Sequence, residues 1–305
     1  MTEHSGRLAA VVVNGARVRD APRLRGACER AAAAVGWRRP LLVATTPDDA
    51  GTGVASQALE AGAALVIVVG GDGTVRACAQ ALTGTDVPLA IVPAGSANLT
   101  ARALGLPGRL LPALRVAFHG RDRPIDLGRA DGSVFAAMAG IGLDAAVVAG
   151  AHRLAKRLAG WPAYAVAATG QLLRRPVTFD IRIDGGAPLR RVARCVTVGN
   201  SGALPGGFAV LPDARLDDGR LDVVVLAPAG PLGWADVGYR VALGRRRDDG
   251  QLERFRASTV EIRAAAEVGL PRQLDGELIE PSATLTARVL PGALLVKAPP
   301  AGGRG

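Results

Sequence analysis

One stretch of the sequence decides the fold class: Ala64-Leu-Val-Ile-Val-Val-Gly-Gly-Asp-Gly-Thr-Val75. Its first residues are continuously apolar, which is typical of a strand inside a parallel sheet covered by helices on both faces. The glycines that follow permit a tight turn and let a ligand approach the backbone without a Cβ in the way. A helix beginning there offers free N–H groups and a positive dipole end to an anion. The stretch predicts a strand, a phosphate-binding turn and a helix; an ordinary strand–turn–helix link is the alternative.

The flanking sequence alternates between strand and helix from residue 8 to about 118. This alternation predicts a three-layer α/β domain with a mostly parallel sheet. Expected strands are 8–13, 41–45, 64–69 and 89–92, and expected helices are 23–35, 54–61, 75–82 and 97–104. After a boundary near Leu127–Asp131, short β-rich segments predict a second, mainly antiparallel domain that begins with a strand at Val134–Met138. Helical insertions are expected at about 143–175 and 231–246.

A second turn with the same chemistry is Val92-Pro-Ala-Gly-Ser-Ala-Asn-Leu99. It also follows an apolar strand, and it brings a hydroxyl, an amide and a glycine to the start of a helix. In a parallel sheet both turns lie at the carboxyl ends of their strands, which is the edge where open α/β sheets bind ligands. Two such turns at one edge indicate phosphate binding more specifically than either turn alone.

Acidic residues gather in two later segments. Pro212-Asp-Ala-Arg-Leu-Asp-Asp-Gly-Arg-Leu-Asp222 can hold a hard cation through carboxylates and carbonyls, and a hairpin turn explains it equally well. Gln273-Leu-Asp-Gly-Glu277 places two carboxylates around a glycine. A kinase needs a group that accepts the proton of the acceptor hydroxyl, which either carboxylate can do, although a solvated turn is the simpler interpretation.

Composition limits the class of protein. The chain has 305 residues and a formal net charge of +10. This positive charge suits binding to anionic lipid, phosphorylated substrates or nucleic acid. A general bias of the composition towards Arg explains the charge equally well. Cys28, Cys78 and Cys195 are far apart and have no metal-ligand spacing, so neither disulfides nor zinc are expected. The apolar stretch Leu8–Val13 is too short for a signal peptide, and no run reaches the roughly 18 apolar residues of a membrane span. We therefore expect a cytoplasmic protein.

These segments occur in the same order in the diacylglycerol kinase catalytic-domain family, which the chain resembles over nearly its whole length. The resemblance rests on residues 70–74, 93–98, 140–144, 206–207 with 212–222, and 274–277. It implies an N-terminal three-layer α/β nucleotide domain, like that of NAD kinases and diacylglycerol kinases, and a C-terminal β-sandwich domain. The first domain would comprise residues 1–128 and a return at about 290–305, and the second would comprise residues 129–289.

The resemblance also implies a lipid kinase that transfers the γ-phosphate of ATP to a diacylglycerol-like or sphingoid-like hydroxyl. The implied nucleotide contacts are Gly70, Gly71, Asp72, Gly73, Thr74, Val75, Ser96, Asn98 and either Thr45 or Thr46. The implied magnesium site uses the carbonyls of Arg215 and Arg220 and the carboxylate of Asp218. Glu277 matches the general base, and Asp275 beside it and Asp72 complete the implied catalytic set.

Two other functions stay open: an NAD or other small-molecule kinase, and a non-catalytic protein that binds lipid or nucleotide. NAD kinases usually carry Asn-Glu and Leu-Gly-Phe-Leu segments after the glycine turn, and neither occurs here. As partners we expect a lipid substrate at a membrane surface and no nucleic acid, and homodimer formation stays open. Peripheral contact with the inner membrane face would use the basic segments 152–158, 171–175 and 245–247. The alternative is that these segments are solvated helix faces.

Overall fold

The chain folds into two compact units. The computed structural model describes residues 6–18, 20–143, 175–202, 211, 213–242 and 248–300. Unit 1 comprises Met1–Ile125 and Gly292–Gly305, and unit 2 comprises Asp126–Pro291. Strands β5 (Arg121–Ala130) and β16 (Thr284–Ala298) run continuously from one unit into the other. Most of the predicted helical insertion at 143–175 lies outside the described residues.

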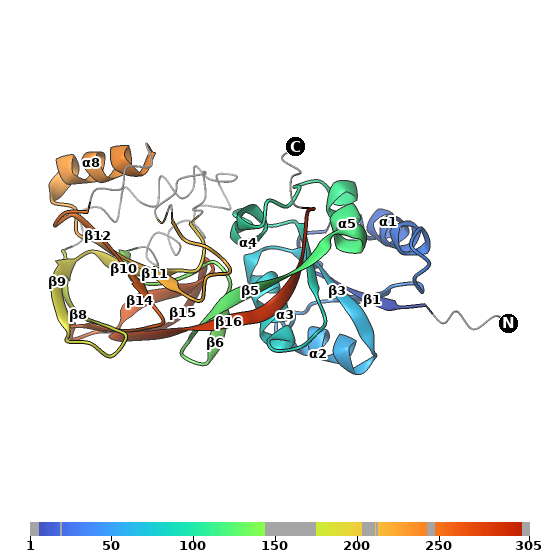
Figure 1. Ribbon diagram of the computed structural model, residues 1–305, viewed down its shortest axis with the longest axis horizontal. Coiled ribbons are helices and arrows are strands. Elements are labelled where there is room, and N and C mark those ends of the chain that lie inside the picture. Colours follow the sequence, from blue (N-terminus) through green and yellow to red (C-terminus); the bar gives the residue numbers. More distant parts are fainter. Residues whose placement is uncertain are drawn as a thin grey trace. The chain divides into compact units, whose positions relative to one another are not determined.

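Unit 1 is a parallel sheet covered on both faces by helices (Figure 1). Its strands lie in the order β2-β1-β3-β4-β16, and α1 and α5 cover one face while α2 and α3 cover the other. The three-layer α/β domain predicted from the sequence is confirmed. The elements are β1 (Leu8–Val13), α1 (Ala21–Ala33), β2 (Leu41–Ala44), α2 (Thr52–Glu60), β3 (Ala63–Gly70), α3 (Asp72–Leu82), β4 (Leu89–Pro93), α4 (Leu99–Ala103) and α5 (Leu110–His119).

Local chemistry explains these elements. All but one of the residues of β3 are buried, as expected of a strand with helices on both sides. Helix α1 begins where the Asp20 side chain accepts the N–H of Arg23 at 2.9 Å, and a proline stands in its first turn. One face of the sheet packs against α1 and α5 in a core built from small and branched apolar residues, including Val11, Leu24 and Leu114.

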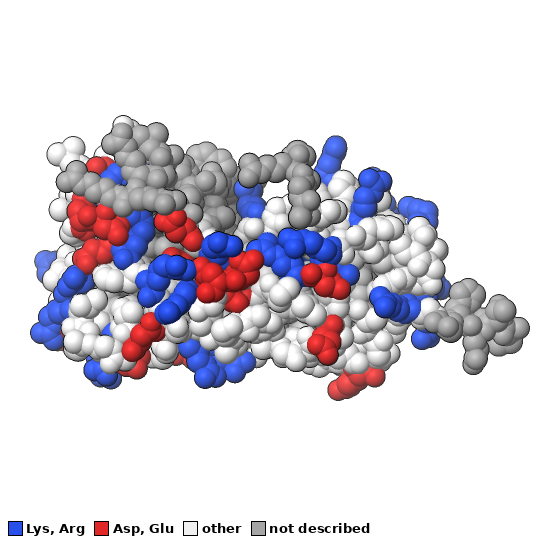
Figure 2. All heavy atoms as spheres, in the orientation of Figure 1, with Lys and Arg blue, Asp and Glu red and all other residues white. Residues whose placement is uncertain are grey.

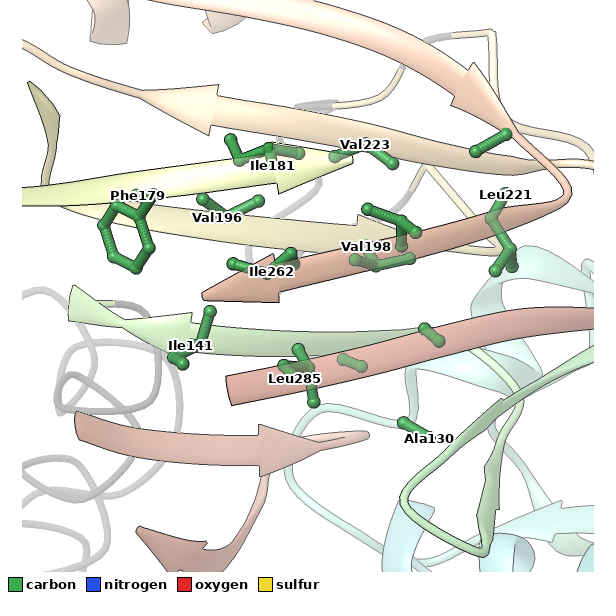
Figure 3. Close-up of a cluster of buried hydrophobic side chains, with 14 of the residues drawn as sticks. Ala130, Ile141, Phe179, Ile181, Val196, Val198, Leu221, Val223, Ile262 and Leu285 are labelled. Carbon is green, nitrogen blue, oxygen red and sulfur yellow. The ribbon is translucent and has the colours of Figure 1, made fainter. Parts of the chain in front are cut away.

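Unit 2 is a β-sandwich, as predicted. One of its sheets has the order β12-β11-β10-β7-β14-β15, and the facing strands are β16, β13, β8 and β9 with β5 and β6. Apolar side chains from both layers interdigitate between them, among them Ile141, Val196, Phe179 and Ile262 (Figure 3). The elements are β6 (Ser133–Phe135), β7 (Met138–Gly142), β8 (Val177–Ile183), β9 (Leu189–Ala193), β10 (Cys195–Gly199), β11 (Leu221–Leu226), α8 (Gly230–Ala242), β12 (Leu252–Ala257), β13 (Thr259–Ala264), β14 (Leu270–Leu274) and β15 (Glu277–Ser282).

One predicted strand is wrong. The apolar run Val134–Met138 is not a single strand, because the chain bends at Ala136 and Ala137 and passes from β6 in one sheet to β7 in the other. The amides of Ala136, Ala137 and Met138 donate to the side chain of Asp275. A partner that lies so far along the chain leaves no trace in the local apolar pattern.

Candidate active site

The two glycine turns of unit 1 touch each other. A Cβ added to Gly95 would lie 2.5 Å from the Cα of Gly71, and one added to Gly71 would lie 3.1 Å from the Cα of Gly95. The contact arises because β3 and β4 are parallel neighbours that end together, with Gly70 opposite Pro93. The structure therefore brings the predicted phosphate-binding turns together at one edge of the sheet, which is where α/β proteins bind ligands.

Helix α3 begins in the first of these turns, directly after Gly71. Helix geometry leaves the first N–H groups, those of Asp72, Gly73 and Thr74, without an acceptor inside the helix. The side chains of Thr74 and Val75 are buried, and the hydroxyl of Thr74 accepts the Asn14 amide at 3.1 Å. Thr74 can thus contact a nucleotide through its backbone N–H, whereas the Val75 N–H donates to the Gly71 carbonyl at 3.0 Å.

Asp72 and Asn98 connect the turns internally. Asp72 Oδ1 accepts the N–H of Thr100 at 3.3 Å, so it supplies the N-terminal cap of α4 rather than of its own helix. Asn98 has a left-handed backbone, and its amide both accepts from the Gly95 N–H at 2.9 Å and donates to the Gly95 carbonyl at 2.8 Å. In the structure, both side chains hold the two turns in shape. Ser96, in the second turn, is exposed.

The turn after β2 distinguishes between Thr45 and Thr46. The hydroxyl of Thr46 accepts the N–H of Asp49 at 3.1 Å, and its N–H donates to the Asp49 carbonyl. Thr45 is half-buried and its N–H donates to the Val13 carbonyl at 2.9 Å. The Thr46 hydroxyl therefore closes its own turn, which makes Thr45 the better candidate for a nucleotide contact.

The second predicted half of the site lies in unit 2, on the hairpin that joins β14 to β15. Glu277 is half-buried and is the first residue of β15, paired with Leu274. Asp275 is 3% exposed, and its carboxylate accepts the N–H groups of Ala136 and Ala137 at 2.8 Å and of Met138 at 2.9 Å. Both oxygens of Asp275 are thus already used by the backbone.

The predicted cation ligands lie on the turn before β11. Both oxygens of Asp218 have partners, since one accepts the N–H of Arg220 at 3.1 Å and the other pairs with the guanidinium of Arg256. The Arg220 side chain reaches Asp184 at 3.2 Å, and Arg215 lies 3.6 Å from Asp217. Within the described ranges, no group of three His, Cys, Asp or Glu residues is arranged to hold a metal ion. As folded, Arg256 occupies the carboxylate that a magnesium ion would need.

Asp222, at the start of β11, is a further acidic residue of this turn. It is 6% exposed and faces Arg256 across the β11–β12 pair. Burial raises its pKa from the usual 3.8 to about 6, Arg256 lowers it in part, and Asp218 and Asp213 raise it. Arg256 therefore compensates only part of the negative charge around Asp222, because Asp218 and Asp213 still raise its pKa.

Sequence reasoning missed several residues that shape the site. Asn14 and Arg256 are separated from their partners by many residues, and nothing in the local sequence indicates the contacts. Buried Gln273 accepts the N–H of Gly276 at 2.8 Å. Gln273 stands three residues before the glycine of an Asp-Gly turn, so its contact is the one of these that the local sequence indicates. The predicted site segments 206–207, Pro212 and Asp144 lie outside the described residues.

Surface charge is mixed on the face that Figure 2 shows, where Lys and Arg side chains lie interspersed with Asp and Glu. The predicted lipid-facing segments 152–158, 171–174 and 245–247 lie outside the described residues. Among the helices that are described, none is long and apolar enough to cross a membrane. Burial raises the pKa of Cys28 to about 11 and that of Cys78 to about 12, which makes both thiols poor nucleophiles.

Known proteins resemble this chain in both sequence and fold. The diacylglycerol kinase catalytic domain matches residues 9–130, and the YegS C-terminal NAD kinase beta sandwich-like domain matches residues 137–298. A Pseudomonas aeruginosa protein named "Probable lipid kinase YegS-like" is 36% identical over 254 residues, which cover 81% of this chain and 80% of that protein. A diacylglycerol kinase of Mycobacterium tuberculosis is 35% identical over 179 residues, covering 55% of this chain and 56% of that protein.

A solved structure supports the fold. The crystal structure of a diacylglycerol kinase from Bacillus anthracis str. Sterne matches with a TM-score of 0.72 at 22% identity, covering 97% of this chain and 98% of that one. The family match extends over both units, and the relatives bear the names of kinases. The chain therefore belongs to the diacylglycerol kinase catalytic-domain family of lipid-kinase-like enzymes, as its sequence predicts.

Proposed function

We propose that the protein is an ATP-dependent lipid kinase that transfers the γ-phosphate to a hydroxyl group of a diacylglycerol-like or sphingoid-like lipid. The observation that carries the proposal is the contact between the turns at Gly71 and Gly95 at the carboxyl edge of the sheet. Backbone approaches so closely there that side chains are excluded, and α3 begins in the same turn, where its first N–H groups have no acceptor inside the helix. This geometry suits a polyphosphate.

The roles of the remaining residues follow from the chemistry of phosphoryl transfer. Thr45 and Ser96 would contact the nucleotide through hydroxyls, beside the amides of Asp72 and Gly73. The lipid hydroxyl oxygen forms a bond to the γ-phosphorus as the bond from that phosphorus to the β,γ-bridging oxygen breaks, and ADP leaves. Glu277 accepts the hydroxyl proton and later releases it to water. Magnesium bound with ATP would neutralise phosphate charge, and Asp72 is the acidic residue of the turn that would orient it.

A transfer assay tests the proposal. Purified protein is incubated with γ-labelled ATP and magnesium and with separate acceptors: diacylglycerol, a sphingoid base and phosphatidylglycerol in vesicles, and NAD in solution. We expect label in a lipid, and we expect Glu277→Gln to lower kcat by roughly 100- to 10,000-fold. Glu280→Gln is the matched control, because Glu280 lies exposed on the same strand.

The other outcomes of the assay decide between the alternatives. Faster labelling of NAD than of any lipid would make the protein a small-molecule kinase. Tight ATP binding without transfer to any acceptor would make it a non-catalytic binding protein. The proposal includes peripheral contact with a membrane surface, since a lipid acceptor must be reached there. Sedimentation with vesicles at several salt concentrations tests that contact. The amounts of wild-type chain and of Arg245→Glu that sediment with the vesicles should differ in their dependence on salt.

A further inference from the structure

The hairpin that carries Glu277 has a two-residue turn with an uncommon backbone. Asp275 and Gly276 both have positive φ angles, 48° and 80°. This is the combination that a type I′ turn requires, and Asp-Gly is one of the sequences that prefers it. Because Leu274 and Glu277 are the paired residues on either side, the position of the turn determines the position of Glu277.

Asp275 ties this turn to the bend between β6 and β7. Its carboxylate accepts the N–H groups of Ala136, Ala137 and Met138, and its own N–H donates to the Met138 carbonyl at 2.8 Å. A carboxylate that is 3% exposed is costly to bury unless hydrogen bonds replace its water. Three charge-assisted hydrogen bonds meet that need, and they make the attachment strong and directional.

The bend is held from its other side as well. Asn200 is fully buried, and its side-chain amide donates to the carbonyl of Ala136 at 3.1 Å. The backbone N–H groups of Asn200 and Ser201 donate to the carbonyl of Ala137 at 2.8 and 3.1 Å. The amides of the bend therefore face Asp275 while its carbonyls face Asn200, so the bend is a fixed support for the hairpin.

We propose that Asp275 is a positioning residue that acts on catalysis through Glu277, and that it is not itself a base. A base needs an oxygen that reaches the acceptor hydroxyl, whereas both oxygens of Asp275 are buried and bound to backbone amides. By fixing the turn, Asp275 fixes the start of β15, where Glu277 lies. This inference rests on the proposed role of Glu277 as general base.

A double-mutant cycle tests the inference in the full-length chain. Asp275→Asn keeps the shape of the side chain but replaces one acceptor oxygen with an NH₂ group that faces a backbone N–H. We expect kcat to fall roughly 10- to 100-fold, because small displacements of a catalytic group cost about that much. The KM for ATP should change less than about twofold, since no nucleotide contact is lost. In a Glu277→Gln background the same change should lower kcat less than about threefold.

The chain supplies a matched control in Asp184. Asp184 also has a left-handed backbone (φ 47°), precedes a glycine and accepts backbone N–H groups, those of Ser258 and Thr259, at 2.7 Å. Its turn carries no proposed base. Asp184→Asn should lower the unfolding temperature because it weakens two exposed hydrogen bonds to backbone N–H groups, and it should leave kcat within about twofold of wild type.

Each remaining outcome has a defined meaning. Equal losses of kcat from Asp275→Asn in the wild-type and Glu277→Gln backgrounds would overturn the positioning role while leaving Glu277 as base. Full activity of Glu277→Gln would overturn both, because Asp275 would then have no base to position. If Asp275→Asn does not fold, Gly276→Ala replaces it: its φ of 80° strains the turn, while an added Cβ meets no atom within 4 Å. The same fall in kcat at constant KM is expected.

Discussion

Aspartate followed by glycine recurs at left-handed positions of this chain. Among the described residues, Asp131, Asp184 and Asp275 have φ angles of 48°, 47° and 48°, and each precedes a glycine with positive φ. Aspartate tolerates this backbone better than most residues do. The sequence alone makes the three turns equivalent, and only the fold distinguishes Asp275 by burying its carboxylate among amides.

Asp49 provides a test of stability at the level of one residue. Its carboxylate accepts the N–H groups of Gly51 and Gly53 at 2.9 and 3.1 Å and of Val54 at 2.8 Å, and so caps α2. We expect Asp49→Ala to lower the free energy of unfolding by about 1–2 kcal/mol in urea titrations. Asp48→Ala is the control, since Asp48 is exposed, and an equal loss from both variants would contradict the capping role.

The same residue gives a dependence on pH. Hydrogen bonds from the backbone N–H of Gly51, and then of Gly53 and Val54, lower the pKa of Asp49 below its usual 3.8. A lowered pKa means that the ionised carboxylate stabilises the fold, so its contribution is present above pH 3.8 and is lost as the pH falls through the lowered value. The stability difference between wild type and Asp49→Asn should therefore shrink as the pH falls below 3.8.

Thr45 and Thr46 give a functional test at the same scale. Thr45→Val should raise the KM for ATP by roughly 2- to 10-fold, as the loss of one hydrogen bond does, with little change in stability. Thr46→Val should lower stability instead, because its hydroxyl accepts the Asp49 N–H. Parallel steady-state kinetics and thermal unfolding separate the two, and a larger KM effect from Thr46→Val would reverse the assignment.

At the scale of elements, the contact between the two glycine turns depends on the absence of side chains. An added Cβ at Gly95 would lie 2.5 Å from the Gly71 Cα and 2.8 Å from the Asn98 Oδ1, so backbone must move. We expect Gly95→Ala to cost about 1–3 kcal/mol and to weaken ATP binding. Gly108→Ala should change neither quantity, because an added Cβ there meets nothing within 4 Å. Normal ATP affinity in Gly95→Ala would place the nucleotide elsewhere.

The turn before β11 makes a prediction about metal removal. If Arg256 balances the charge of Asp218 and Asp222, chelation of magnesium in the absence of nucleotide should leave the unfolding temperature unchanged. Arg256→Met should lower stability by about 1 kcal/mol, since the guanidinium is half exposed and its partners are mostly buried. A fall in unfolding temperature on adding EDTA to the wild type would instead show that a cation stabilises this part of the protein.

At the scale of the whole molecule, unit 1 depends on residues from the far end of the sequence. Leu294, Val296 and Ala298 are buried, and Val296 pairs with Leu89 beside β4. Val296→Asp should therefore lower the free energy of unfolding by at least about 3 kcal/mol and remove ATP binding. Thr286→Lys is the matched control, because Thr286 is exposed on the same strand. Retained ATP affinity in Val296→Asp would show that the nucleotide turns form without this strand.

Whether the sequence predicts a feature of the fold or the site depends on how far apart along the chain the interacting residues lie. The strands ending at Gly70 and Pro93 are predictable, because continuous apolar runs and glycine turns are local signals, and so is their meeting at one edge. Three other features are not predictable, because each joins segments that only the fold brings together. They are the bend at Ala136, the hydrogen bonds from that bend to Asp275, and the ion pair of Arg256 with Asp218. Short β-rich segments predicted an antiparallel second domain, and the family resemblance implied a sandwich, but a local pattern cannot tell which carboxylate is buried.

The path of β16 has a consequence for biosynthesis. Unit 2 is one uninterrupted piece of sequence, so the ribosome has translated all of it before it reaches Gly292. Unit 1 begins earlier but lacks its last strand until residues 292–298 have also emerged. The unit that is started first is thus completed last, and a nascent chain can assemble its sandwich while its nucleotide-binding sheet still has an open edge.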